Sequence, residues 1–255
     1  MFVHYRAKGF ILKKIDSGET DRIFTIYTKD FGKLELLAKA VRKIKSKLRA
    51  GLELFYLSEI EFIQGKTYKT LTDAILIDKF ENLRKSLRKL AIAYKISEVL
   101  DNLVKGQEPD ESLWNLLNET FQKLNTSGTR RAGVKPITYN LIYHYFLWNL
   151  LSILGYQHEL YNCAICQKKL IPEKLYFSSK EGGIICQSCF KKIKLGKPSQ
   201  ILQNKTWAGK EVKPETVKIL RIILEKNWLT LSKLKIEKDF LKELASISKL
   251  CEKNL

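Results

Sequence analysis

The sequence predicts an α+β protein, with a small β-barrel at its N-terminus, a helical domain after it, and a cysteine-rich module embedded in the helical domain. Three observations lead to this fold class. Short segments rich in β-branched and aromatic residues fill the first eighty positions. Apolar residues then recur at helical spacing. Two Cys-X-X-Cys pairs interrupt the helical pattern. At 255 residues and 45% apolar content, the chain is long enough for two or three modules.

Five strands are predicted in the first eighty residues, at 9–16, 21–28, 33–41, 52–64 and 67–77. Turn signals lie between strands at Ser17-Gly18, at 30–32 and at 64–66. Polar and apolar residues alternate from Glu59 to Phe62, as expected for a strand with one buried face. Five antiparallel strands in so short a span favour a closed barrel, and we expect a five-stranded OB-fold over 1–80.

Two helices are predicted next, in the first part of a helical domain at 81–160. The first carries an apolar stripe and ends near Gly106. Pro109 and Asp110 open the second. The two expected stripes are Leu83, Leu87, Leu90 and Tyr94, and then Leu113, Leu117, Phe121 and Leu124.

A polar break at 126–135 precedes an apolar central helix, which we expect to begin at Pro136 and to end at Gly155. Its polar residues, among them His144, favour a buried core helix over a membrane span. The C-terminal part of the helical domain, 193–255, contains a helix from Pro214 and a last helix. The apolar stripe of the last helix is Phe240, Leu244, Ile247 and Cys251.

Charges scattered through the first residues indicate no signal peptide, so we expect a cytoplasmic protein. In that compartment cysteines stay reduced, and paired cysteines are metal ligands before they are disulfides. Cys163-Ala-Ile-Cys166 and Cys186-Gln-Ser-Cys189 have the spacing of a structural Zn²⁺ site, with a hairpin at 174–185 between the pairs. We therefore expect a four-cysteine zinc finger at 161–192. An iron–sulfur cluster and a redox dithiol are the alternatives.

Positive charge is the strongest bias of the composition. The formal net charge is +19, which favours an anionic partner, first nucleic acid and second an anionic membrane. Residues 38–51 contain no acidic side chain. The six cations of this stretch are Lys39, Arg42, Lys43, Lys45, Lys47 and Arg49. Ten lysines against two glutamates between Lys168 and Lys210 make the cysteine module a second basic surface.

Catalytic signatures are poor, and we expect no enzyme. Asp16, Glu19 and Asp21 lie in a turn, where three acids are more often a polar loop than a magnesium site. We interpret His144 as a hydrogen-bonded core residue and Cys251 as a buried thiol. Seven aromatic residues fall on the predicted barrel, and most of them are expected in its core: Phe24, Tyr27, Phe31, Phe55, Tyr56, Phe62 and Tyr68.

Three segments of the chain resemble the bacterial RecO family of recombination mediators, and the resemblance extends over nearly the whole length. Residues 18–53 are similar to the family's first-domain pattern, with Ser46 and Leu48 in its "kS.l" element. LGYQHEL at 154–160 looks like the link into the family's zinc module, and the four cysteines with Phe177-Ser178 and Gly182-Gly183 match its finger pattern. Ala40 stands where the family usually has glycine and Gln167 where glycine is frequent, and the Ala40 change could alter the path of the basic stretch.

The resemblance implies an N-terminal OB-fold, a helical domain and an embedded zinc finger. It also implies binding of single- and double-stranded DNA and annealing of complementary strands. The implied partners are RecR, RecF in some pathways, and the C-terminal tail of single-strand binding protein (SSB), with RecA loading as the outcome. In this interpretation the six cations of 38–51 contact the DNA backbone.

Two other functions stay open. An RNA-binding OB protein with a zinc ribbon is compatible with the composition. A zinc-finger DNA repair enzyme such as a glycosylase is the other, although sixty-six residues follow Cys189 here and the finger of those enzymes is C-terminal.

Overall fold

The computed structural model describes residues 3–65, 68–127, 138–195 and 209–253. The chain divides into two compact units, Met1–Gly133 and Val134–Leu255. Within the ranges just given, none of the helices combines the length and apolar character that a membrane span needs. The finer division predicted from the sequence, into residues 1–80, 81–160, 161–192 and 193–255, stays a prediction.

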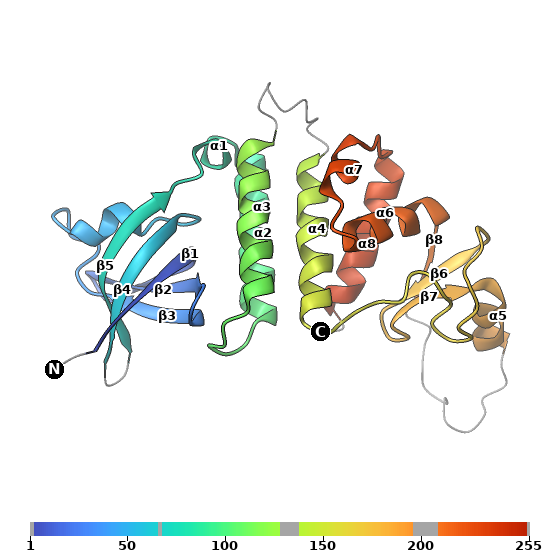
Figure 1. Cartoon of the computed structure of the whole chain (residues 1–255), viewed down its shortest axis with the longest axis horizontal. Helices are drawn as coiled ribbons and strands as arrows, with labels where there is room; N and C mark the ends of the chain where they lie inside the picture. Colours follow the sequence, from blue (N-terminus) through green and yellow to red (C-terminus); the bar gives the residue numbers. More distant parts are fainter. Residues whose placement is uncertain (1–2, 66–67, 128–137, 196–208, 254–255) are drawn as a thin grey trace. The chain divides into compact units, whose positions relative to one another are not determined.

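The first unit begins with a closed five-stranded barrel, which confirms the predicted OB-type fold (Figure 1). Its strands are β1 (His4–Ser17), β2 (Asp21–Thr28), β3 (Gly32–Ala38), β4 (Leu57–Gln64) and β5 (Lys69–Asp78). The order around the barrel is β1-β2-β3-β5-β4. The expectation of purely antiparallel pairing is wrong at one seam, because β3 and β5 pair in parallel. Two consecutive residue pairs form this seam, and it closes the barrel.

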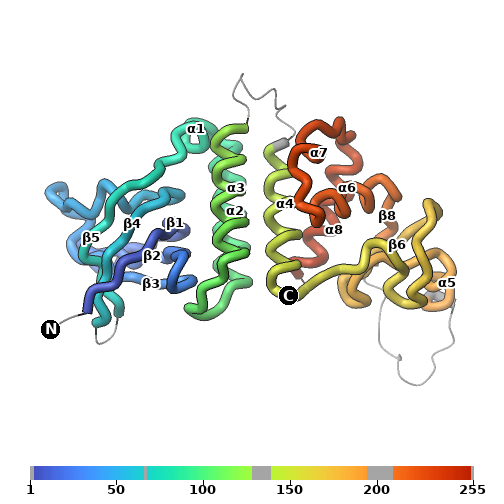
Figure 2. The backbone as a smooth tube through the Cα atoms, in the orientation of Figure 1, coloured from blue at the N-terminus to red at the C-terminus, as the bar shows by residue number. Residues whose placement is uncertain are grey.

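Strand ends differ from the sequence expectation where the backbone leaves the β region. β3 stops at Ala38 rather than at residue 41, since Ala40 has a φ of +53°. Residues 52–56 do not belong to β4, because a short 3₁₀ helix η1 (Lys47–Gly51) and a φ of +65° at Phe55 precede the strand. The trace in Figure 2 follows this long connection from β3 to β4.

Helices α1 (Glu81–Arg84), α2 (Leu87–Leu103) and α3 (Glu111–Thr126) complete the first unit. They pack on the outer surface of the barrel through an aromatic cluster. In this cluster the Phe10 ring of β1 lies 5.2 Å from the rings of both Trp114 and Phe121. Polar contacts join the same elements: Ser97 Oγ donates to the carbonyl of Leu12 at 2.7 Å. The barrel and these three helices therefore form one body.

The predicted stripe of the first helix is wrong at Leu87 and Tyr94, whereas Leu83 is buried as expected. The segment breaks into α1 and α2 at Lys85 and Ser86. Leu87 is 85% exposed and Tyr94 is 53% exposed. The buried face of α2 instead contains Ile92, Ala93, Ile96, Ser97 and Leu100, together with Lys89. Lys89 is 4% exposed and its Nζ donates to the carbonyl of Asn125 at 3.2 Å, near the C-terminal end of α3. The buried face therefore runs through Ile92, Ile96 and Leu100 and not through the predicted leucine spacing.

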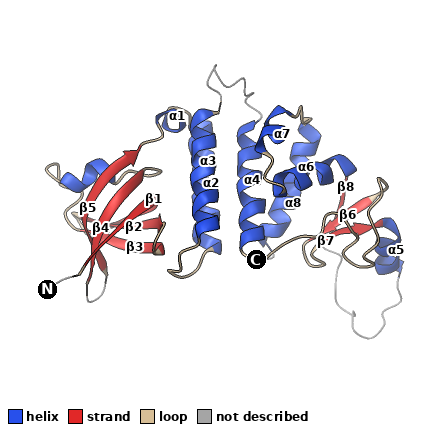
Figure 3. Cartoon of the chain, in the orientation of Figure 1, coloured by secondary structure: helices blue, strands red, loops and turns tan. Residues whose placement is uncertain are grey.

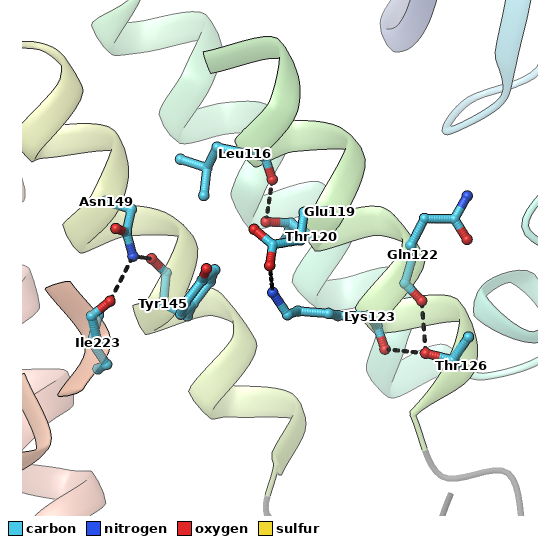
Figure 4. A network of polar contacts seen from close by, with 9 residues as sticks. All are labelled: Leu116, Glu119, Thr120, Gln122, Lys123, Thr126, Tyr145, Asn149 and Ile223. Carbon is cyan, nitrogen blue, oxygen red and sulfur yellow. Dashed lines mark hydrogen bonds and ion pairs between the residues drawn. The ribbon is translucent and has the colours of Figure 1, made fainter. Parts of the chain in front are cut away.

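The second predicted helix is confirmed as α3. The side chain of Asp110 accepts a hydrogen bond from the backbone N–H of Leu113 at 2.9 Å and so caps the helix. All four residues of its predicted stripe are buried. Within α3, Thr120 Oγ1 donates to the carbonyl of Leu116 at 2.7 Å (Figure 4).

The second unit contains the central helix α4 (Thr138–Ile153) and, near its C-terminus, the helices α6 (Pro214–Leu224), α7 (Trp228–Lys233) and α8 (Lys238–Lys253) (Figure 3). The expected break at 126–135 and the start at Pro136 fall largely outside the described residues. Gly155, with a φ of +87°, ends the central helical segment as predicted. Asn149 is 1% exposed and its Nδ2 donates to the carbonyls of Tyr145 and Ile223 at 2.8 and 3.0 Å, which ties α4 to α6 (Figure 4).

His144 and Cys251 are core residues, as expected. The Nδ1 atom of His144 lies 2.9 Å from Ser248 Oγ, between α4 and α8. Cys251 is 2% exposed, and burial raises the pKa of its thiol to about 12. Neither residue has the exposure that a nucleophile or proton-transfer group needs.

Candidate functional site

The cysteine module is built on a three-stranded sheet and one short helix. β6 (Leu175–Ser178) and β7 (Gly183–Cys186) form the predicted hairpin, and α5 (Gln187–Leu195) follows directly. The sheet order is β7-β6-β8, where β8 (Lys210–Val212) comes from beyond the module. Sequence reasoning missed β8, because three residues are too few to show alternation.

The hairpin turn requires glycine at one position. A Cβ atom at Gly183 would lie 2.2 Å from the carbonyl oxygen of Glu159, where the link into the module crosses the hairpin. The backbone of Glu159 accepts from Ile184 N at 2.9 Å and donates to Gly182 O at 2.8 Å. The Glu159 carboxylate accepts from the N–H groups of Tyr161 and Asn162 at 2.7 and 2.9 Å, and these hydrogen bonds lower its pKa. The link at 154–160 is thus fixed to the hairpin next to the first cysteine pair.

The structure brings the four predicted cysteines together. The Sγ atoms of Cys163, Cys166, Cys186 and Cys189 all lie within 4.8 Å of one another. Those of Cys166 and Cys186 are 3.9 Å apart. A tetrahedral ion with Zn–S bonds of about 2.3 Å needs S···S distances of about 3.8 Å. The cluster therefore has the size and the donor set of a four-thiolate metal site.

Cys163 and Cys166 lie on a tight turn, and backbone N–H groups surround the sulfur of Cys163. Cys163 N donates to Lys168 O at 2.8 Å, and Gln167 N donates to Cys163 O at 2.9 Å. Gln167 has a φ of +58° in this turn. Burial acts to raise the pKa of the Cys163 thiol, but backbone N–H groups, first that of Cys166, lower it to about 6. This favours the thiolate form of Cys163.

The four cysteines lie in a small core of their own. Cys163 and Cys189 are buried beside Tyr176 and Ile185. The Tyr176 ring stacks on Phe190 at a centroid distance of 3.6 Å. Four sulfur ligands leave no position for a substrate on a tetrahedral ion, so such an ion stabilises the module and takes no part in chemistry.

The surface of the module is basic, as the composition indicated. Seven of the ten lysines from Lys168 to Lys210 have described side chains, and all seven are exposed: Lys168, Lys169, Lys174, Lys180, Lys191, Lys192 and Lys210. The other three, Lys194, Lys197 and Lys205, are among the residues whose side chains are not described.

In the first unit, the predicted cationic stretch forms a loop that leaves β3 and ends in η1; residues 39–49 are called the basic loop below. All six of its cations are exposed: Lys39, Arg42, Lys43, Lys45, Lys47 and Arg49. Val41 is 3% exposed and belongs to the barrel core, and Leu48 packs against the same core. The loop is thus attached to the barrel by two apolar side chains while its cations face solvent.

Acidic residues of the β1–β2 turn hold the start of the basic loop. Asp21 Oδ1 accepts from the backbone N–H of Ala40 at 2.7 Å, and this bond, with a second one from Thr20 Oγ1, lowers the pKa of Asp21. The Arg42 guanidinium donates to Gly18 O at 3.2 Å and lies 3.5 Å from Asp16. Asp16 also accepts from Arg22 at 2.6 Å. These acids serve the loop's structure, in keeping with the polar-loop interpretation.

The barrel aromatics are distributed as expected. Phe24, Tyr27, Phe55 and Phe62 are buried, and Phe31 and Tyr56 are half-buried against the barrel core. Tyr68 is 45% exposed.

Sequence reasoning missed the role of Asp21 as the anchor of the basic loop. It also missed that Ala40 takes a left-handed backbone conformation. The signal was present, since Ala40 and Gln167 both occupy positions where the resembling family has glycine, and both have positive φ. The alanine therefore keeps a conformation that glycine adopts without strain.

Comparison with known proteins agrees with this architecture. The family model for "Recombination protein O N terminal" matches residues 1–80, and that for "Recombination protein O C terminal" matches residues 84–253. A "DNA repair protein RecO" of Dehalococcoides mccartyi is 35% identical over 240 residues, which is 94% of this chain and 86% of that protein. One of Desulfitobacterium hafniense is 28% identical over 252 residues, 98% of this chain and 85% of its own. One of Thermoanaerobacter is 27% identical over 232 residues, 91% of this chain and 84% of its own. With both family models matched over nearly its entire length, the chain belongs to the RecO family of DNA repair and recombination proteins.

Proposed function

We propose that the protein binds single- and double-stranded DNA through the basic loop and anneals complementary strands, without catalysing a covalent reaction. The observation that carries this proposal is the loop itself: six exposed cations on a backbone fixed to an OB-type barrel. OB-folds bind nucleic acid in this way, with cations along the phosphates. The family's role in DNA repair makes DNA the nucleic acid.

The cations of the loop differ in their availability to a ligand. Arg42 shares its guanidinium with Asp16 and Gly18. Lys43, Lys45 and Lys47 are exposed, and none of them forms an ion pair with a described carboxylate. Phosphate contacts are assigned first to these three lysines, which lie in the middle of the loop. Lys39 and Arg49 contribute at the two ends of the loop, and Arg42 also holds the loop in place.

Annealing needs only electrostatics of this kind. Two strands repel each other, and a protein that neutralises both of them without reading their sequence lets them search for register. Long, flexible lysine side chains bind phosphate as point charges, which permits sliding. The lysines of the cysteine module provide a second phosphate-binding surface in the same chain.

The cellular setting and partners follow from the family. We place the protein in the cytoplasm at the nucleoid, where it acts on SSB-coated DNA by contacting the C-terminal tail of SSB. RecR, and RecF in some pathways, join it in loading RecA. These partners are inferred from the family alone.

Zn²⁺ is the proposed occupant of the four-cysteine cluster. Four cysteine sulfurs within 4.8 Å of one another are close enough to share one ion, and thiolates suit Zn²⁺ better than hard cations. Metal analysis of the purified protein should find one zinc per chain. Iron with visible absorption would instead indicate an iron–sulfur cluster.

The first test is annealing of two labelled complementary oligonucleotides, on bare strands and on strands coated with SSB, in the absence of ATP. We expect acceleration in both cases. Tight DNA binding without acceleration would contradict the annealing proposal. A strong preference for RNA of the same sequence, or base release from damaged duplex, would favour the RNA-binding protein or the glycosylase.

Residue assignment is tested with the triple substitution Lys43→Glu, Lys45→Glu and Lys47→Glu. The matched control is Lys233→Glu, Lys235→Glu and Lys238→Glu, three exposed lysines of the second unit. Both triples lower the net charge equally. We expect only the loop triple to weaken single-strand binding at about 50 mM salt and to reduce the salt slope by about 2. Equal losses for the two triples would mean that net charge, rather than the loop, governs binding.

A further inference from the structure

Ile44 is an apolar side chain displayed at the centre of the basic loop. At 92% exposure it is the most exposed of the large apolar residues that the structure describes. Its immediate neighbours in sequence are Lys43 and Lys45. Single exposed apolar residues are common on protein surfaces, so exposure alone identifies no site. The significance of Ile44 depends on how the loop holds it.

The backbone around Ile44 is closed by hydrogen bonds. Arg42 N donates to Thr20 O at 3.0 Å, which joins the loop to the β1–β2 turn. Ser46 N donates to Lys43 O at 3.0 Å, so Ile44 is a central residue of a four-residue turn. Val41 on one side and Leu48 on the other pack into the barrel core. Of the three aliphatic side chains between residues 41 and 48, two are fixed inward and Ile44 alone is presented outward.

The ligand of this turn must match both charge and apolar surface within a few ångströms. A nucleic-acid strand has this chemistry, because phosphates alternate with apolar base faces. In a continuous duplex the base faces are stacked on one another, whereas an unpaired strand exposes them. Apolar side chains, isoleucine among them, insert against base steps in several DNA-binding proteins.

We propose that Ile44 packs against an unpaired base while the neighbouring lysines neutralise the flanking phosphates. The basic loop then binds strands with unpaired bases more tightly than a continuous duplex. This inference rests on the proposed DNA-binding function and adds a specificity residue to it. An aliphatic contact is weaker than an aromatic stack, so the base is easily released when its complementary partner arrives.

Ile44→Ser is the test, with Ile75→Ser as the matched control. Ile75 is an isoleucine of β5 in the same barrel and is 59% exposed, but acidic residues, Glu59 and Asp73, lie beside it. We expect Ile44→Ser to weaken binding to a single-stranded oligonucleotide by about tenfold, equivalent to about 1.4 kcal/mol. Binding to the corresponding duplex should change by less than about twofold. Ile75→Ser should change neither affinity.

The salt dependence distinguishes this contact from the phosphate contacts. Ile44→Ser removes no charge, so the slope of log affinity against log salt should be unchanged, whereas the loop triple reduces it. A strand with a single 2-aminopurine, whose fluorescence reports stacking, should respond to the wild-type protein and less to Ile44→Ser. Circular dichroism spectra of the variant should match those of the wild type, because Ile44 makes no core contact.

The outcomes separate this inference from the function on which it rests. If the loop triple loses DNA affinity while Ile44→Ser binds both DNAs normally, the contact to bases is refuted and the proposed function stands. If neither variant affects binding, the loop is not the DNA site. Binding to vesicles containing phosphatidylserine that is lost in Ile44→Ser, with DNA binding intact, would overturn the inference in favour of a membrane surface.

Discussion

Ala40 is the residue at which the basic loop turns away from β3, and replacing it with glycine should stabilise the protein. Ala40 has a φ of +53°, and its N–H is held by the carboxylate of Asp21 at 2.7 Å. In this conformation the Cβ atom of an L-residue crowds the following carbonyl. Ala40→Gly removes the Cβ atom and keeps the N–H, so the hydrogen bond to Asp21 is preserved.

The size of the effect follows from two opposing terms. The left-handed conformation costs a residue with a Cβ atom about 1–2 kcal/mol. Glycine gives the unfolded chain extra entropy, which opposes the gain by about 0.4–1 kcal/mol. The net expectation is a stabilisation of about 0.5–1 kcal/mol. For a unit of the size of Met1–Gly133 this corresponds to a rise of about 2–4 °C in Tm.

Scanning calorimetry of the full chain measures this shift. Ala50→Gly is the control, because Ala50 is an exposed residue of η1 whose φ is not positive. Glycine there should lower Tm, since only the entropic term applies. A Tm that is unchanged or lower in Ala40→Gly would refute the reasoning that this alanine holds backbone strain.

Four further predictions concern other parts of the chain. Gln167→Gly should likewise raise the Tm of the second unit, because φ at Gln167 is +58°; unfolding followed by calorimetry checks this. Treatment with a strong chelator should destabilise the cysteine module and leave the barrel folded, as monitored by limited proteolysis. Asn149→Ala should destabilise the protein by about 1–3 kcal/mol in urea unfolding, since the buried carbonyl of Ile223 loses its side-chain donor. The pKa of Glu61 is lowered to about 2, first by the hydrogen bond from Arg6. The stabilisation that ionised Glu61 provides is fully present above pH 4.5 and is lost as the pH falls toward 2. Glu61→Gln should therefore make the free energy of unfolding less dependent on pH between these two values.

The barrel was predictable because its strands show local signals. Leu34 and Leu36 alternate with half-buried or exposed residues along β3, and turn residues separate the strands. The parallel pairing of β3 with β5 was not predictable, because it depends on a crossover through η1 and β4. Periodicity reports which faces are apolar but not which strand lies beside which.

The first helix shows where periodicity misleads. A regular leucine spacing predicted a face that includes Leu87, yet Leu87 is exposed and Lys89 is buried. Burying a lysine is unfavourable unless its charge finds a partner. Here the partner is the carbonyl of Asn125, which belongs to a helix 36 positions away in the chain. This hydrogen bond joins segments that are distant in sequence, and local spacing contains no record of such a contact.

The cysteine cluster and the basic loop also differ in how far local sequence predicts them. The cysteine cluster was predictable from spacing alone, because two residues between cysteines fit one ion. The basic loop was predictable as a charged segment, but its attachment through Asp21 and its outward Ile44 were not. Both depend on side chains of the barrel that are near in space and separate in sequence.

The aromatic cluster between the barrel and its helices determines how this protein can be divided for experiments. The N-terminal family match ends at residue 80, which invites expression of the barrel by itself. Such a fragment would lack Trp114 and Phe121. Phe10 and Phe55 would then be exposed to water and would form an apolar surface prone to aggregation. Insolubility of that fragment would therefore be no evidence against DNA binding by the barrel. The shortest piece worth purifying extends to about residue 133, where the compact unit itself ends.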